Sequence, residues 1–285
     1  LESLNSNETS DYTSSAVTVK PLISYSGNLN GGNNNKPIEI GQIKLTGDEN
    51  LLLKSGYIIG FGADYLGRKT YGRGRYFNFE AGISYSINPT HSLDIVNAGA
   101  KLCSRNQVID WWYIDGCIER ARQIKDLTID HQSALNLSVS KLISGTKHNY
   151  SEVSVGLNTQ IMKDYTQNQL LLEFDNIHSN DIYSSVKLKL GAPVQSQLAL
   201  NRSGSIELGF NFNDKPMRVF YSISKANGGH FFGSSRDEIT YIAHMSYSVW
   251  NNLSATVGFR KTNSKIDYFD LTEPIFGLNF AQIVF

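Results

Sequence analysis

Two cysteines, Cys103 and Cys117, are the only ones in the chain of 285 residues. An even pair at this spacing in a secreted protein predicts a disulfide that closes a loop of about 15 residues. A metal site is the other chemistry to weigh, but no histidine and no second cysteine pair lies nearby, and zinc needs four ligands. The pair therefore predicts a cross-link formed in an oxidising compartment, and we expect no metal and no cofactor.

The loop that would hold this cross-link, residues 104–126, is the longest connection that the sequence predicts. It contains an apolar group, listed here in full: Val108, Ile109, Trp111, Trp112, Tyr113 and Ile114. Apolar residues in an outer loop either fold inward as a plug or lie exposed as a partner site. Both interpretations stay open, and either makes this loop a candidate gate.

His244 shares one strand face with Ser246 and Ser248, a combination that a Ser/His/acid hydrolase would use. The polar face of any strand lining a wet interior looks the same, however. The sequence contains no G-x-S-x-G, no H-E-x-x-H and no P-loop. We therefore expect a protein that is not an enzyme.

Residues 75–88 show the most regular alternation of apolar and polar side chains. One face would carry Phe77, Phe79, Ile83 and Tyr85, and the other face polar or small residues. The run is longer than a strand of a soluble sandwich and long enough to cross a bilayer, which takes roughly 9–11 residues. The same alternation recurs at 57–65, 153–161, 206–213, 239–249 and 253–260. It predicts strands with one face in lipid and the other facing a polar interior.

The whole pattern predicts an all-β fold, a transmembrane antiparallel outer-membrane β-barrel of about 14 strands over residues 16–285, after a polar linker at 1–15. The predicted strands are 16–27, 37–45, 51–66, 74–88, 91–103, 127–143, 149–162, 168–178, 181–191, 203–213, 216–226, 237–250, 252–262 and 274–285. The linker lacks the apolar core of a signal peptide, so we expect that a signal was removed or that the chain is the C-terminal part of a longer protein.

The connections between these strands alternate in length. The long ones are 27–36, 67–73, 104–126, 163–167, 192–202, 227–236 and 261–273, and the short ones are 46–50, 88–90, 144–148, 179–180, 214–215 and 251–252. Long loops outside and short turns in the periplasm are typical of bacterial outer-membrane barrels. An even strand number also predicts that both termini are periplasmic.

Composition narrows the function classes. The formal net charge is +0 and the pI is near 7.2, so nothing electrostatic favours nucleic acid. Mean hydropathy is −0.27 and no apolar run reaches 18 residues, which excludes a transmembrane helix. Residues that we expect to line the lumen are Asp64, Glu80, Glu152, Glu173, Glu207, Arg218, His244 and Arg260. With Asp175, Lys20, Lys187 and Lys189, which share that face, we count six acids against five lysines and arginines. This near balance disfavours a strongly ion-selective pore.

Three runs, SYSGNLNGGNNNKPIEI, SGYIIGFGADY and NSKIDYFDLTEPIFGLNF, resemble the C-terminal barrel of the surface lipoprotein assembly modifiers, called Slam. Asn28-Leu29-Asn30 is similar to an N-I-N run after the first strand of that family, and residues 264–270 are similar to an S-x-I-x-x-Y-D run before its last strand. The resemblance implies a fourteen-stranded barrel, preceded by a periplasmic helical-repeat domain, that delivers lipoproteins or related cargo across the outer membrane. No helical repeat is found within these 285 residues.

The sequence therefore predicts a translocon that delivers lipoprotein or other secreted protein cargo to the cell surface, with residues 104–126 as its gate. The alternative is a diffusion porin or a polysaccharide-export channel, which would share the same architecture. In either case we expect a monomer in the outer membrane of a Gram-negative bacterium. Its partners would be outer-membrane lipids, the barrel insertion machinery, which would read the C-terminal aromatic Phe285, and protein cargo, with no nucleic acid.

Overall fold

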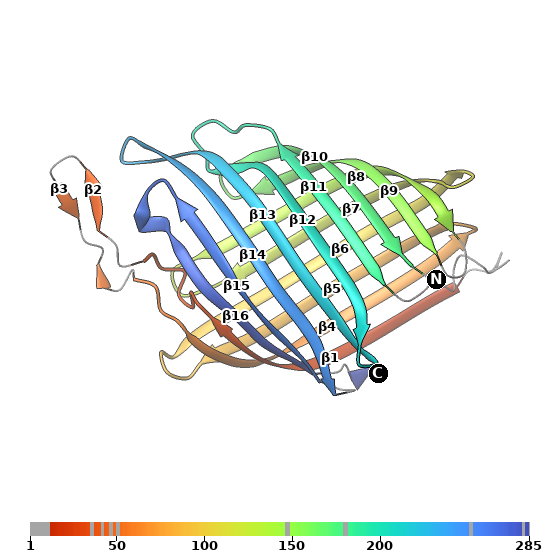
Figure 1. The fold of residues 1–285 in the computed structure, drawn as a ribbon, viewed down its shortest axis with the longest axis horizontal. Helices are drawn as coiled ribbons and strands as arrows, with labels where there is room; N and C mark the ends of the chain where they lie inside the picture. The colour runs from red at the N-terminus through yellow and green to blue at the C-terminus, as the bar shows by residue number, and fades with distance from the viewer. Residues whose placement is uncertain are drawn as a thin grey trace.

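The computed structural model describes residues 12–34, 37–40, 43–45, 48–49, 52–145, 149–178, 182–250, 253–280 and 283–284. Long antiparallel strands wrap into a closed barrel (Figure 1). The barrel strands are β1 (Tyr12–Ser26), β4 (Gly56–Gly72), β5 (Arg75–Asn88), β6 (Leu93–Ile109), β7 (Trp112–Ile124), β8 (Ile129–Gly145), β9 (Tyr150–Met162), β10 (Thr166–Ile177), β11 (Tyr183–Gly191), β12 (Ala199–Phe212), β13 (Lys215–Phe231), β14 (Ser234–Trp250), β15 (Leu253–Ser264) and β16 (Leu271–Phe280). A short 3-10 helix, η3 (Asp267–Phe269), precedes β16.

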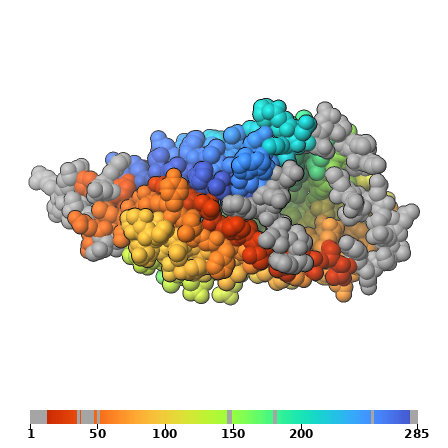
Figure 2. All heavy atoms as spheres, turned by 90° about the horizontal axis from the view of Figure 1, so that it is seen from below, coloured from red at the N-terminus to blue at the C-terminus, as the bar shows by residue number. Residues whose placement is uncertain are grey.

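Each strand pairs with its sequence neighbours, and the ring closes where β1 meets the end of the chain. β16 pairs with β1 over four residues, Leu22–Tyr25, and β17 (Ile283–Val284) pairs with Thr18 and Val19 further along the same strand. β16 and β17 thus share one place beside β1, so the 15-stranded sheet is a ring of fourteen positions. Figure 2 shows this seam, where the red and orange N-terminal strands lie against the blue C-terminal strands. The ring confirms the predicted fold class.

The two ends of the barrel differ in their connections. One end carries the described chain ends, Tyr12 and Val284, and the turns at 73–74, 110–111 and 213–214, and we call it the terminal rim. The other end, the loop rim, carries the connections 27–55, 192–198 and 265–270. A small hairpin, β2 (Ile38–Ile40) and β3 (Ile43–Leu45), projects beyond the loop rim (Figure 1). Both described chain ends therefore lie at the same rim.

The alternation of side chains gives the barrel two different surfaces. Large apolar residues on the outer face remain exposed, among them Leu157 at 63%, Ile118 at 61% and Ile83 at 59%. An exposed apolar band of this kind is stable only in lipid, which identifies a membrane-spanning barrel. The barrel strands run from 9 to 17 residues, long enough for a tilted crossing. No helix in the described part of the chain is long and apolar enough to cross a membrane.

Two errors in the predicted strand list cancel each other. Residues 37–45 were predicted as one barrel strand, but 38–40 and 43–45 are two short strands, β2 and β3, that pair with each other outside the barrel sheet. Residues 112–124 were predicted as part of a loop, but they form β7 and pair with β6 and β8 along their length. The outer face of β7 carries Gly116, Arg120 and Arg122 among its apolar residues, so the alternation that identified other strands is broken here.

These errors also misplaced two connections. The predicted long loop at 67–73 is mostly strand, because β4 continues to Gly72, and its turn lies at the terminal rim. The predicted short turn at 88–90 lies instead at the loop rim. The first strand, β1, begins at Tyr12, four residues before the predicted strand start at residue 16. Residues 1–11 and the C-terminal Phe285 lie outside the described residues.

Candidate functional site

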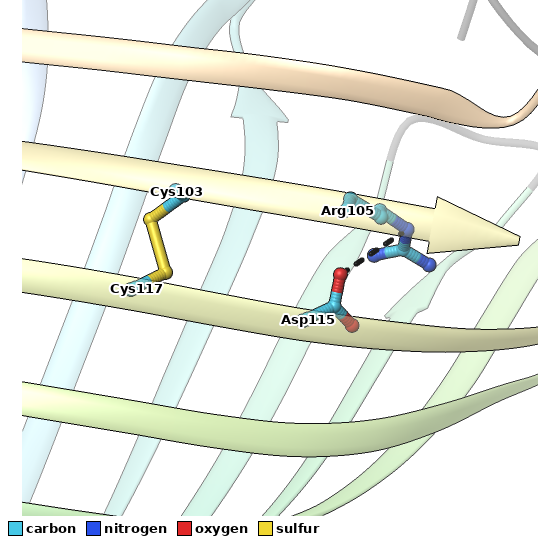
Figure 3. Close-up of a disulfide and its surroundings, with 4 residues drawn as sticks. All are labelled: Cys103, Arg105, Asp115 and Cys117. Carbon is cyan, nitrogen blue, oxygen red and sulfur yellow. Dashed lines mark ion pairs between the residues drawn. A yellow bond between two sulfur atoms is a disulfide. The ribbon is translucent and has the colours of Figure 1, made fainter. Parts of the chain in front are cut away.

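Cys103 of β6 and Cys117 of β7 are directly paired across the two strands and form a disulfide (Figure 3). Their Cα atoms are 4.1 Å apart. Because the two residues already face each other in the sheet, the bond links neighbouring strands of a hairpin and does not close an irregular loop. Both cysteines line a cavity in the lumen.

An ion-pair cluster lies two residues further along the same two strands, toward the terminal rim. Arg105 Nη2 donates to Glu152 Oε2 at 2.8 Å, and its Nε lies 3.7 Å from Asp115 Oδ1 (Figure 3 shows the Asp115 pair). The Arg105 guanidinium also lies over the ring of Tyr113, 4.1 Å from its centroid. Ser140 Oγ donates to Asp115 Oδ2 at 2.9 Å. These contacts fix charged side chains from β6, β7 and β9 against the inner wall near the terminal rim.

Further ion pairs join neighbouring strands around the lumen. Lys20 and Asp64 are 2.6 Å apart, Arg260 and Glu273 are 3.6 Å apart, and Arg218 and Glu207 are 3.9 Å apart. A fourth pair, between two directly opposed residues of β10 and β11, joins Glu173 and Lys187. Each pairing neutralises charge locally, so the lumen is wet and polar without a ring of one sign.

Open space remains between these side chains. One cavity of about 590 Å³ is lined by Lys20, Asp64, Ser84, Asn97 and Gln123, with Gly62, Gly82 and Gly99 in its wall. A second, of about 410 Å³, is lined by the disulfide, the Arg105 cluster and polar residues of β8 to β11. Glycines on the inner face leave room that larger side chains would fill. The lumen is therefore a polar space and not a packed apolar core.

The structure places all eight predicted lumen residues on the inner face of their strands. They are Asp64, Glu80, Glu152, Glu173, Glu207, Arg218, His244 and Arg260. His244 stacks on Phe220, with ring centroids 4.8 Å apart, and its Nδ1 atom is buried without a hydrogen-bond partner. Ser246 accepts a hydrogen bond from Thr256. In the described part of the chain His244 bonds neither to a serine nor to an acid, so the geometry assembles no catalytic triad there.

The predicted gate lies elsewhere than expected. Trp111 is in the tight turn between β6 and β7 at the terminal rim, not in a long loop at the other end. Val108, Ile109, Trp112 and Ile114 are exposed on the outside of the barrel. Tyr113 alone is buried against the inner wall, at 7% exposure. Apolar and aromatic residues at a barrel rim that face outward are typical of an interfacial girdle, and they do not cover the lumen.

Residues 28–34, which we call the mouth segment, fold back from the end of β1 into the loop rim. Leu29 and Asn30 are fully buried at 0% exposure. Leu29 packs with Leu93 and Ile95 of β6, and Ile58 of β4 packs against the same cluster. This is the apolar cluster inside the described barrel, and it attaches the mouth segment to the inner wall.

Hydrogen bonds hold the segment beside the β7–β8 turn. Asn30 Oδ1 accepts from the backbone N–H of Lys54 at 3.0 Å, and the Asn30 carbonyl accepts from the N–H of Leu127 at 3.0 Å. Lys125 Nζ donates to the carbonyl of Asn28 at 2.9 Å. Burial beneath the segment lowers the pKa of Lys125 from its ordinary value. The β7–β8 turn and the mouth segment therefore form one polar unit.

The other end of the segment reaches a different part of the ring. Asn34 Nδ2 donates to the backbone carbonyls of Asp267 and Asp270, at 2.8 and 2.7 Å, in the turn before β16. Gly31 has a φ of +76°, and a Cβ at that position would lie 2.6 Å from Thr128 Oγ1. Since β7 and β16 are far apart in the strand order, the mouth segment crosses the opening of the barrel at the loop rim.

Sequence reasoning missed the role of this segment and of β7. The available signal was one leucine among asparagines and glycines, GNLNGG, in a run that would otherwise be a solvated loop. The ion pairs of Arg105 and Asp115 were missed because β7 was not predicted as a strand.

No protein-family model matches the sequence, and no curated protein matches it significantly. Solved structures with a similar fold include OccAB3 of Acinetobacter baumannii, with 7% identity over 96% of this chain and 99% of that chain at a TM-score of 0.46. The outer membrane protein OprD of Pseudomonas aeruginosa has 7% identity over 99% and 96% of the two chains at a TM-score of 0.45. The outer membrane protein OpdK of the same species has 6% identity over 96% and 99% at 0.46. Likeness at this level says nothing about function, and the barrel assignment stands on the chain's own strand order.

Proposed function

We propose that the protein is an outer-membrane channel of a Gram-negative bacterium through which small polar solutes pass, narrowed at the loop rim by the mouth segment. The observation that carries this proposal is the lumen, which combines cavities with charges that are paired across neighbouring strands. A lumen of this kind accommodates hydrated solutes and attracts neither cations nor anions strongly.

The orientation follows from the two rims. Bacterial outer-membrane barrels have short turns in the periplasm and longer loops outside, and here the longest connection, 27–55, leaves the loop rim. Both termini would then be periplasmic. We also propose that the barrel is a monomer inserted by the barrel insertion machinery, because the closed ring leaves no free strand edge for pairing with another copy.

Reconstitution in planar bilayers tests the channel. We expect a steady conductance with weak preference between cations and anions, and liposome swelling in neutral sugars that stops above a size limit. A barrel that is folded, as judged by its heat-modifiable migration in gels, but admits neither ions nor sugars would contradict the proposal.

A second candidate, delivery of lipoprotein or other protein cargo, is favoured by one specific contact. Of the three runs that resemble the surface lipoprotein assembly modifiers, the first and the last are far apart in sequence, yet Asn34 of the first donates to the backbone carbonyls of Asp267 and Asp270 of the last. Both runs thus build the same mouth. A cargo machine would need such a mouth to be closed until cargo engages it.

Surface labelling of intact cells separates the two candidates. If the barrel delivers cargo, deleting its gene removes particular lipoproteins from the labelled set, and an Asn34→Ala variant restores them poorly. If it is a solute channel, the labelled set is unchanged and only solute uptake falls. Unchanged surface proteins in the deletion strain would end the delivery hypothesis.

A further inference from the structure

Basic side chains lie in two groups on the outer face of the barrel close to the loop rim. Arg120 and Arg122 are on β7, and Arg202, Lys225 and Lys261 are on β12, β13 and β15, on the other side of strands β8 to β11. Each shares its face with lipid-facing residues of the same strand: Ile118 precedes Arg120, Ile223 precedes Lys225 and Phe259 precedes Lys261. These bases therefore begin where the apolar band ends, at the depth of the lipid headgroups. We call them the headgroup cluster.

Two pairs in this cluster bring cations together. Arg202 and Lys225 are directly opposed on neighbouring strands, which puts their Cβ atoms about 5 Å apart. Arg120 and Arg122 are successive outward residues of β7, so their side chains leave the same face of one strand. Like charges in direct opposition destabilise a sheet unless an anion lies between them.

The protein supplies almost no anion to balance them. Among the described residues Arg120, Arg122 and Arg202 form no ion pair and no hydrogen bond through their side chains. Asp237 is close enough to Lys225 for the two charges to interact. It already forms an ion pair with Lys265, however, with Nζ and Oδ2 3.1 Å apart. By contrast, every acid of the lumen pairs described above has a base beside it. The imbalance is confined to the surface that faces lipid.

Bases on the outer face near the terminal rim are arranged differently. Lys69 is opposed to Phe77, and Lys141 lies over the ring of Trp112, 5.0 Å from its centroid. Lys215 donates to the carbonyl of Val249. No like charges are directly opposed in that described set. If these bases only extended to water, their neighbours should be similar at both rims. The adjacent cations at the loop rim therefore indicate a ligand there.

We propose that the headgroup cluster binds the phosphate groups of a membrane lipid that carries more than one phosphate on its headgroup. Arginine binds phosphate oxygens through two parallel N–H donors, and each of the two pairs presents neighbouring cations that one phosphate can bridge. A multiply phosphorylated lipid can occupy neighbouring sites on adjacent strands. The proposal concerns the outer wall and does not depend on what passes through the lumen.

The test uses the purified full chain and three matched double variants. Two remove bases from the cluster, Arg120→Gln with Arg122→Gln, and Arg202→Gln with Lys225→Gln. The control removes two outward bases at the terminal rim, Lys69→Gln with Arg75→Gln. The probe is a lipid with a bisphosphorylated diglucosamine headgroup, added in detergent, and bound lipid is counted by native mass spectrometry. The same lipid without phosphates and inorganic phosphate alone are the comparison ligands.

Each interfacial base contributes about fivefold to affinity for an anionic lipid, so each cluster variant should bind the bisphosphorylated lipid about 25-fold more weakly. The control variant should bind it like the wild type, and the lipid without phosphates should bind weakly to all. A variant with Arg120→Lys and Arg122→Lys should recover most of the affinity, which separates charge from folding. Loss in one cluster pair alone assigns the site to that pair. Equal loss in the control, or equal binding of both lipids by the wild type, would overturn the proposal.

Discussion

Leu29 is the side chain through which the mouth segment makes its apolar contact with the barrel wall. It is fully buried and is the one apolar side chain that the mouth segment inserts between β4 and β6. The neighbouring asparagines satisfy backbone groups that would otherwise be buried without partners. One apolar contact and a few hydrogen bonds therefore hold a segment that is otherwise polar.

Truncating this side chain should loosen the mouth. Leu29→Ala removes buried contacts worth about 2–5 kcal/mol, so the segment should leave the wall more often and the single-channel conductance should rise. Ile109→Ala is the control, because Ile109 is 70% exposed on the outside of the barrel. Equal conductance of wild type and Leu29→Ala would show that the segment does not limit flow.

Lys125 should make attachment of the mouth segment to the barrel wall depend on pH. Burial lowers the pKa of Lys125 below the ordinary value of 10.5, so a state with the segment detached would bind the proton more readily than the attached state. Glu273 and Asp130 partly oppose the shift and Arg260 adds to it. Attachment should therefore become more favourable as pH rises from the lowered pKa toward the ordinary one. Conductance should fall over that interval, and a Lys125→Met variant should lose the dependence.

Neighbouring residues on one strand should tolerate charge very differently. Leu157 faces lipid and is 63% exposed, whereas Asn158 lines the lumen. A lysine near the bilayer midplane costs about 2–4 kcal/mol, and one in the lumen little. Leu157→Lys should thus reduce the folded fraction in a urea titration, while Asn158→Lys should not. Similar losses from both changes would contradict the assigned faces.

At the scale of elements, the β6–β7 hairpin shows where sequence patterns succeed and fail. The alternation in 75–88 and 153–161 predicted β5 and β9 well, because each face of those strands has one environment. β7 was missed because Arg120 and Arg122 replace apolar residues on its outer face. Outward residues at the depth of the lipid headgroups are polar, as are inward residues that face the lumen. Alternation of apolar and polar side chains therefore cannot tell the two faces of a strand apart at that depth. The mouth segment was missed because its folding depends on contacts with β6 and the turn before β16, which no local pattern contains.

The disulfide gives this hairpin a measurable property. Denatured, unreduced protein should show no free thiols, and reduction should release two. Cross-linking a loop of about 15 residues restricts the unfolded chain by up to about 3 kcal/mol, so a Cys103→Ser, Cys117→Ser variant should unfold at lower urea. A wild type that releases two thiols before reduction would contradict the cross-link.

At the scale of the whole molecule, the prediction of fourteen strands was correct although one predicted strand, 37–45, was wrong and β7 was missing from the list. The hairpin β2–β3 replaced β7 in the count, so every strand from β8 onward kept its direction. The candidate lumen residues lie on the inner face for the same reason, because most of them are on strands with regular alternation. The candidate gate residues lie at the opposite rim from the one expected, because the strand that contains half of them was not predicted.

Labelling of single cysteines tests the orientation of the entire barrel. Gln195→Cys lies in a connection of the loop rim and Asp214→Cys in a turn of the terminal rim, and both positions are exposed. A membrane-impermeant maleimide should label the first in intact cells and the second only after the outer membrane is opened. The native cysteines are bonded to each other and should not react with the maleimide. The reverse pattern would place the termini outside.

The seam between β1 and β16 has a consequence for how fast the barrel assembles. β1 pairs with β4 over fifteen residues but with β16 over only four, followed by two with β17. Joining the first strand to the last also requires the longest sequence separation in the protein, and such contacts form slowly. Closure of the ring should therefore be the late step of folding, and until it occurs an open sheet with two unpaired edges persists in the membrane. Substitutions along Leu22–Tyr25 should lengthen the lifetime of that intermediate more than substitutions in β9 or β10 do, and its exposed edges are where a misassembled barrel would begin to aggregate.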